Sequence, residues 1–139
     1  MKSKKEKPLV WLIEDDSVHM DFLKKCIQED GLDQHLEFQY FESAFDTIRE
    51  TARPKYIVQD IAAISVCGQS WDTITAHVKN LICRHPEAIF LIYSAIEIYA
   101  KDAVEEIENE FEDQNQMVFC VKHADPAQWW TDVISKFER

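Results

Sequence analysis

The chain has 139 residues, enough for one compact domain, and 46% of them are hydrophobic, as in proteins with a buried core. Its 26 acidic and 15 basic residues give a net charge of −11, which repels nucleic acids and anionic membrane surfaces and suits partners with basic faces. No apolar run approaches the roughly 20 residues of a membrane-spanning helix, so we expect a cytoplasmic protein without membrane insertion or a nucleic-acid partner.

The densest run of basic residues lies at the start of the chain, within residues 1–7. Chain ends of this kind are usually poorly ordered, so we expect a flexible basic tail. Residues 8–139 contain no linker, repeat or low-complexity stretch. We expect them to form a single domain.

The first half of the chain alternates predicted strands and helices. Residues 9–13 form a short apolar run of the kind that is buried on both faces of a sheet. Apolar residues recur at helical spacing over 17–30, between a capping aspartate and a glycine. A second strand is predicted at 36–41, and a second helix at 43–52, before a proline.

The second half continues the same alternation. Residues 56–60 predict a third strand, and a helix follows from about 70 to 83. A fourth strand is predicted at 88–93, with a long helix running toward Phe111. A fifth strand is predicted at 117–121.

The last predicted helix begins near Pro126, a residue that suits the first turn of a helix. Adjacent helical residues point about 100° apart, so Trp129 and Trp130 cannot both face the core. We expect Trp130 to be the core residue, together with Val133, Ile134 and Phe137. We hypothesise that Trp129 contributes to a partner surface.

Five strands that alternate with five helices predict an α/β fold. Parallel strands need crossover connections, and these place helices on both faces of a doubly wound, five-stranded parallel sheet. The layout alone does not identify a function.

Polar residues follow four of the predicted strands at their carboxyl ends, where functional groups collect in parallel sheets. Glu14 and Asp15 follow the first strand, Asp60 ends the third, Ser94 follows the fourth and Lys122 the fifth. Carboxylates that meet at one edge repel one another unless a cation lies between them, and Mg²⁺ prefers such oxygen ligands. Lys122 would add a positive charge and Ser94 a hydroxyl donor.

A carboxylate in this setting can accept a phosphoryl group, since the transfer needs mainly alignment and charge neutralisation. Asp60 is the best candidate nucleophile because it stands alone at the end of a central strand. Acidic residues also favour helix N-termini, which would explain any one of them. That explanation does not account for five polar residues placed together at carboxyl strand ends.

These residues resemble the receiver domain of two-component response regulators, over a stretch from about Pro8 to the last helix. Residues 10–17, Val-Trp-Leu-Ile-Glu-Asp-Asp-Ser, resemble its first strand and acidic pair. Residues 54–60 resemble the segment with its phosphoacceptor aspartate, and Gly68 follows Asp60 at the usual spacing. The fold implied is flavodoxin-like, with strand order 2-1-3-4-5.

The resemblance also implies a ligand set. Asp15, Asp60 and the backbone carbonyl of Ala62 would bind Mg²⁺, with Glu14 acting nearby or through water. No other cofactor is implied.

Further positions match the groups that hold and report the phosphoryl group. Ser94, followed by alanine, and Lys122 would hold the phosphoryl oxygens. Phe119, three residues before Lys122, matches the aromatic position that turns inward on phosphorylation, so Ser94 and Phe119 would form the switch.

The implied function is that of a stand-alone receiver in phosphorelay signal transduction, and not an enzyme beyond its own phosphorylation and dephosphorylation. A histidine kinase or histidine phosphotransfer protein would donate the phosphoryl group to Asp60. The output would be binding of a downstream protein through the fourth helix, fifth strand and fifth helix. Homodimer formation is left open.

Several departures from the family pattern keep an alternative open. Ala63 and Ile64 replace a common Met-Pro pair, His123 replaces the proline after the lysine, and Gln59 is polar on a buried strand. The alternative is a divergent pseudo-receiver that acts as a phosphorylation-independent interaction module. A haloacid-dehalogenase-type phosphohydrolase is disfavoured, because its second aspartate is replaced by Ala62.

Overall fold

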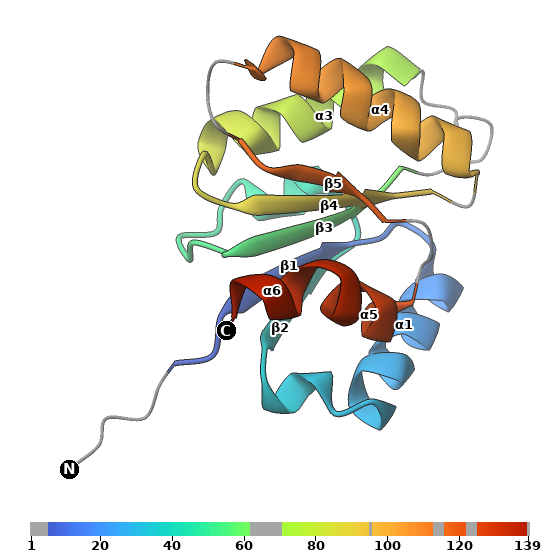
Figure 1. Ribbon diagram of the computed structural model, residues 1–139, viewed down its shortest axis with the longest axis vertical. Coiled ribbons are helices and arrows are strands. Elements are labelled where there is room, and N and C mark those ends of the chain that lie inside the picture. The colour runs from blue at the N-terminus through green and yellow to red at the C-terminus, as the bar shows by residue number, and fades with distance from the viewer. Residues whose placement is uncertain (1–5, 62–70, 95, 113–115, 122–124, 139) are drawn as a thin grey trace.

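The computed structural model centres on a sheet of five parallel strands (Figure 1). It describes residues 6–61, 71–94, 96–112, 116–121 and 125–138. The strands are β1 (Leu9–Ile13), β2 (Glu37–Phe41), β3 (Tyr56–Asp60), β4 (Ile89–Tyr93) and β5 (Val118–Cys120). Their order is β2-β1-β3-β4-β5, which confirms the predicted strand order, and each strand lies within one residue of its predicted bounds.

Helices cover both faces of the sheet, as predicted for a doubly wound fold. The helices are α1 (Ser17–Glu29), α3 (Trp71–Arg84), α4 (Glu97–Glu110) and a C-terminal helix made of α5 (Pro126–Trp129), a π-helical turn (Trp130–Ile134) and α6 (Ser135–Phe137). Helices α3 and α4 lie on one face, and α1 and the C-terminal helix on the other (Figure 1). No helix among the described residues is long and apolar enough to cross a membrane.

Local sequence signals set the ends of α1 and α5. The Asp16 side chain accepts hydrogen bonds from the backbone N–H groups of Val18 and His19, which caps α1. Gly31 follows the helix with φ of 71°, a left-handed conformation that favours glycine. Asp125 caps α5, where Pro126 occupies the first turn.

The predicted helix over 43–52 is wrong. Only a short 3₁₀ helix, η2 (Ala44–Thr47), forms in this segment, so the described residues hold one α-helix fewer than the five predicted. Phe45 and Ile48 are 60% and 58% exposed, so the segment has no continuous buried face to stabilise a longer helix. The Thr47 hydroxyl also donates to the Ala44 carbonyl oxygen at 2.7 Å, a local bond that competes with helix extension.

Alternate residues of the central strands pack into two hydrophobic layers. One layer lies between the sheet and helices α3 and α4, and includes Trp11, Ile57 and Phe90. The other lies beneath α1 and the C-terminal helix, and includes Leu12 and Val58. Both faces of β1, β3 and β4 are therefore buried, which explains their nearly continuous apolar sequences.

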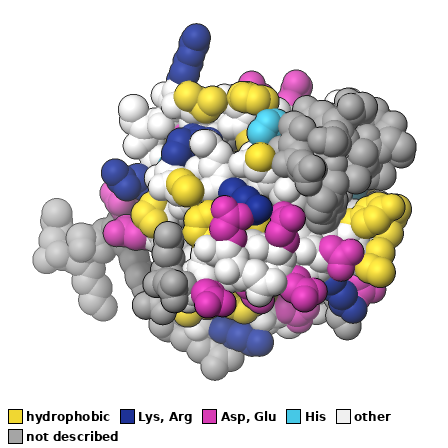
Figure 2. Space-filling model, turned by 90° about the horizontal axis from the view of Figure 1, so that it is seen from above, with side chains coloured by type: hydrophobic (Ala, Val, Ile, Leu, Met, Phe, Trp, Pro, Cys, Tyr) yellow, Lys and Arg dark blue, Asp and Glu magenta, His cyan; other side chains and the backbone are white. Residues whose placement is uncertain are grey.

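The surface above α3 and α4 is rich in acidic side chains (Figure 2). Glu105, Glu108 and Glu110 of α4 are exposed, and Lys79 of α3 contacts Glu106 and Glu110 at 3.4 and 2.5 Å. A single lysine does not neutralise this run of carboxylates. Much of the net negative charge of the chain therefore lies on the exposed face of α4.

The prediction that Trp130, and not Trp129, is the core residue is wrong. Trp129 is 1% exposed and packs in the core, whereas Trp130 is half-buried and stacks on His35 with ring centroids 5.3 Å apart. The cap at Asp125 fixes the start of the helix, and the buried stripe then runs from Pro126 through Trp129. The hypothesis that Trp129 forms a partner surface is therefore wrong.

Replacement of the two tryptophans provides a matched test of this packing. We expect Trp129→Ala to lower the free energy of unfolding by about 3–5 kcal/mol, because it leaves a cavity in the core. Trp130→Ala should cost a smaller amount, roughly 1 kcal/mol. Urea denaturation of both variants measures the difference, and equal losses would contradict the assigned packing.

Candidate functional site

Three carboxylates meet at the carboxyl edge of the sheet. Glu14 and Asp15 follow β1, and Asp60 is the last residue of β3. The two strands pair in parallel with Ile13 opposite Gln59, which brings both strand ends to the same level. One carboxylate oxygen from each acidic residue lies within 4.8 Å of the others. The sheet thus assembles the acidic cluster that the sequence predicted, defined here as Glu14, Asp15 and Asp60.

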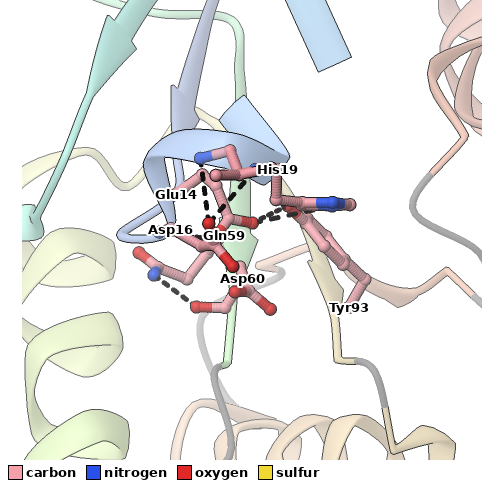
Figure 3. Close-up of polar contacts among 7 residues, drawn as sticks. Glu14, Asp16, His19, Gln59, Asp60 and Tyr93 are labelled. Carbon is pink, nitrogen blue, oxygen red and sulfur yellow. Dashed lines mark hydrogen bonds and ion pairs between the residues drawn. The ribbon is translucent and has the colours of Figure 1, made fainter. Parts of the chain in front are cut away.

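Glu14 is the buried member of the acidic cluster, at 2% exposure. Its Oε1 accepts a hydrogen bond from the backbone N–H of Asp16 at 3.0 Å, and its Oε2 accepts one from the Tyr93 hydroxyl at 2.6 Å. The His19 Nε2 lies 3.8 Å from Oε2. Figure 3 shows these side chains converging on Glu14. The two hydrogen bonds hold the carboxylate in one orientation.

Neither Tyr93 nor His19 was singled out as a site residue from the sequence. Tyr93 ends β4 and pairs with Asp60 across the sheet, so strand alternation places its side chain beside the acidic cluster. His19 occupies the first turn of α1, and helical side chains lean toward the N-terminus of their helix. The strand register could have identified Tyr93, and the position in the first turn of α1 could have identified His19.

The other two carboxylates are less enclosed. Asp15 is exposed and Asp60 is partly buried. The Gln59 amide donates to the backbone carbonyl of Asp60 at 2.7 Å, while its Oε1 is buried without a hydrogen-bond partner in the described part of the chain. The cluster is therefore open on the side of Asp15.

Burial and neighbouring negative charge dominate the electrostatics of Asp60. Burial raises the pKa of Asp60 to about 9, together with the charge of Glu14, a side-chain hydrogen bond to Glu14, and the charges of Asp15 and Asp16. Burial, followed by the negative charges of Glu14, Asp60 and Asp15, also raises the pKa of Tyr93, which keeps its hydroxyl protonated as a donor. The site has an excess of negative charge that either a proton or a cation can balance.

The acidic cluster fits a hard divalent cation. Three oxygen atoms from separate side chains lie close enough together to share one ion, and the surrounding negative charge favours it. Mg²⁺ takes carboxylate oxygens together with waters, and the exposed side at Asp15 leaves room for them. Glu14, Asp15 and Asp60 are the described residues that could hold it.

The remaining predicted site residues are only partly described. Ser94 is buried after β4, and its Oγ accepts from the backbone N–H of Ile96 at 3.2 Å. Phe119 of β5 is half-buried and packs edge-on against Phe137 of α6, with centroids 6.1 Å apart. Their switch roles stay predictions. Lys122, Ala62, Gly68, Ala63, Ile64 and His123 lie outside the described residues.

The raised pKa of Asp60 predicts a pH-dependent stability. Between its unfolded value of 3.8 and about 9, the folded chain binds more protons than the unfolded chain, so stability falls as pH rises through this window. Asp60→Asn should remove that dependence and raise the melting temperature near pH 7.5 by roughly 3–6 °C without metal. Thermal unfolding across pH measures this effect. Asp102→Asn, a substitution at an exposed position of α4, is the control. An equal pH dependence of stability in Asp60→Asn and the wild type would contradict the raised pKa of Asp60.

Comparison with known proteins rests on structure, since no family model and no curated protein matches the sequence. The BeF3-activated receiver domain of DrrB matches with a TM-score of 0.64 and 15% identity, covering 96% of this chain and 100% of that one. The chemotaxis protein CheY4 of Vibrio cholerae matches with a TM-score of 0.62 and 14% identity, over 94% and 98% of the two chains. The response regulator DrrB of Thermotoga maritima matches with a TM-score of 0.62 and 12% identity. The match covers 96% of this chain but only about half (54%) of that one, so this chain spans about half the length of DrrB. The chain therefore has the fold of response-regulator receiver domains.

Proposed function

We propose that the chain is a receiver in phosphorelay signal transduction, switched by Mg²⁺-dependent phosphorylation of Asp60. The observation that carries this proposal is the acidic cluster, whose three oxygens lie within 4.8 Å at the carboxyl edge of a receiver-type sheet. The receiver folds of DrrB and CheY4 support the same class of function.

The chemistry follows from the arrangement of the carboxylates. Asp60 must lose its proton so that one of its oxygens can attack phosphorus, and a neighbouring cation favours that ionised form. An O–P bond forms to Asp60 as the P–N bond of a phosphohistidine donor breaks, and the released imidazole nitrogen takes up a proton. Glu14, Asp15 and Asp60 would hold Mg²⁺, which would supply positive charge that offsets the negative charge of the transferred group.

Other residues of the chain would position the transferred group. Glu14 and Asp15 would hold the cation beside Asp60, with the backbone carbonyl of Ala62 as a further ligand. Ser94, which is buried at the adjacent strand end, would donate its hydroxyl to a phosphoryl oxygen. Lys122 would bind another of these oxygens.

The proposed partners are proteins of the same signalling system in the cytoplasm. A histidine kinase or histidine phosphotransfer protein would donate the phosphoryl group. The output surface would comprise α4, β5 and the C-terminal helix. Its acidic α4 face, with Ile98 60% exposed, suits a partner that combines basic and apolar side chains.

One observation favours a second candidate function. Glu14 is satisfied by hydrogen bonds, and the raised pKa of Asp60 allows a proton to balance the cluster near neutral pH. A divergent pseudo-receiver that binds partners without phosphorylation is compatible with such a proton-balanced site.

Intact mass after incubation with Mg²⁺ and acetyl phosphate separates the two functions. We expect an adduct of roughly 80 Da, formed by phosphorylation of a carboxylate nucleophile. The adduct should be absent from Asp60→Asn, present in Asp102→Asn and lost when a chelator removes Mg²⁺. A folded wild-type protein that forms no adduct, beside a receiver that reacts, would instead support the phosphorylation-independent module.

A further inference from the structure

A buried chain of contacts joins the acidic cluster to the C-terminal helix. The Tyr93 hydroxyl donates to Glu14 at 2.6 Å, and the Tyr93 ring packs against the Trp129 ring with centroids 5.4 Å apart and planes tilted by 35°. All three residues are at most 2% exposed. The contacts connect the end of β1, the end of β4 and α5 without an intervening surface residue.

This chain of contacts has little freedom to rearrange. The Tyr93 side chain has one polar atom, the hydroxyl oxygen, and that hydroxyl donates a hydrogen bond to the carboxylate of Glu14. Its ring packs against the Trp129 ring and also lies near the His19 ring, with the centroids of Tyr93 and His19 6.2 Å apart. Because protein interiors are closely packed, a change at the hydroxyl must move the ring, and a moved ring must disturb Trp129.

Trp129 occupies a sensitive place in the C-terminal helix. It is the last residue of α5, and the π-helical turn Trp130–Ile134 begins directly after it. Wide turns of this kind are uncommon in helices and are frequent at functional sites. A displacement of Trp129 would therefore act where the helix already departs from regular geometry.

We propose that Tyr93 is a positioning residue that holds Glu14 and couples the state of the acidic cluster to Trp129 and the C-terminal helix. The contact network assigns to Tyr93 a role that no predicted site residue has. The response of this coupling to Mg²⁺ rests on the proposed function, whereas the coupling between Glu14 and Trp129 can be measured without metal.

The metal-free test uses ¹⁹F NMR of protein labelled with 5-fluorotryptophan. The chain has four tryptophans, and the Trp129→Phe and Trp130→Phe variants assign the two relevant resonances. Glu14→Leu removes the acceptor of the Tyr93 hydroxyl at similar volume, so it should shift the Trp129 resonance. Glu14→Gln retains an acceptor and should shift it less.

The decisive comparison repeats Glu14→Leu in a Tyr93→Phe background, which keeps the ring and removes the hydroxyl. We expect the Trp129 shift to disappear there, while the Trp130 resonance stays unchanged in every variant because that ring stacks on His35 instead. An equal Trp129 shift in both backgrounds would overturn the proposal, as would no shift in the wild-type background.

Titration with Mg²⁺ then links the coupling to the proposed function. Mg²⁺ should move the Trp129 resonance of the wild type and not that of Tyr93→Phe, whose affinity for Mg²⁺ by calorimetry should be about 10-fold weaker. Equal movement in both proteins would overturn the coupling. If calorimetry shows that the wild type binds no Mg²⁺, the metal site of the proposed function fails, and the metal-free comparison still decides the role of Tyr93.

Discussion

Electrostatic repulsion among the carboxylates of Glu14, Asp15 and Asp60 is the constraint around which the carboxyl edge of the sheet is organised. Two unit charges at the 4.8 Å limit of their separation repel by about 3 kcal/mol at an effective dielectric constant of about 20. Parallel pairing of β1 and β3 holds the backbone positions of Glu14 and Asp60 at the same edge of the sheet. Burial of both faces of the central strands offsets this cost and keeps the arrangement in place.

The fold offsets the burial of Glu14 with hydrogen bonds but gives Asp60 mainly negative neighbours, and this difference suits different roles for the two residues. Glu14 is buried and accepts two hydrogen bonds, which fix the orientation of its side chain. Asp60 is partly buried beside other carboxylates, which raise its pKa and so favour its protonated form when no cation is bound. Glu14 is therefore fixed in place, whereas the charge of Asp60 depends on its surroundings. Because a bound cation favours the ionised form of Asp60, it would also increase the reactivity of that carboxylate. Functional sites commonly retain such unfavourable interactions.

The strands and the acidic cluster could be predicted from sequence because both depend on local pattern. Short apolar runs identified the strands, and acidic residues directly after them fell at one edge through parallel topology. Tyr93 was missed because an aromatic residue inside an apolar run looks like core, and only strand register shows its hydroxyl facing Glu14. The helix at 43–52 and the Trp129 orientation depended on tertiary packing, which periodicity does not contain.

The alternation of side chains along the sheet explains why the site connects to the C-terminal helix. Leu12 and Val58 belong to the layer beneath α1 and the C-terminal helix. Two residues later come Glu14, directly after β1, and Asp60, at the end of β3. Tyr93 packs in that layer as well, and so does Phe119, against Phe137. Two aromatic contacts from neighbouring strands thus reach the same helix, on either side of its π-helical turn. A change in charge at the acidic cluster is therefore transmitted through Tyr93 toward the C-terminal helix.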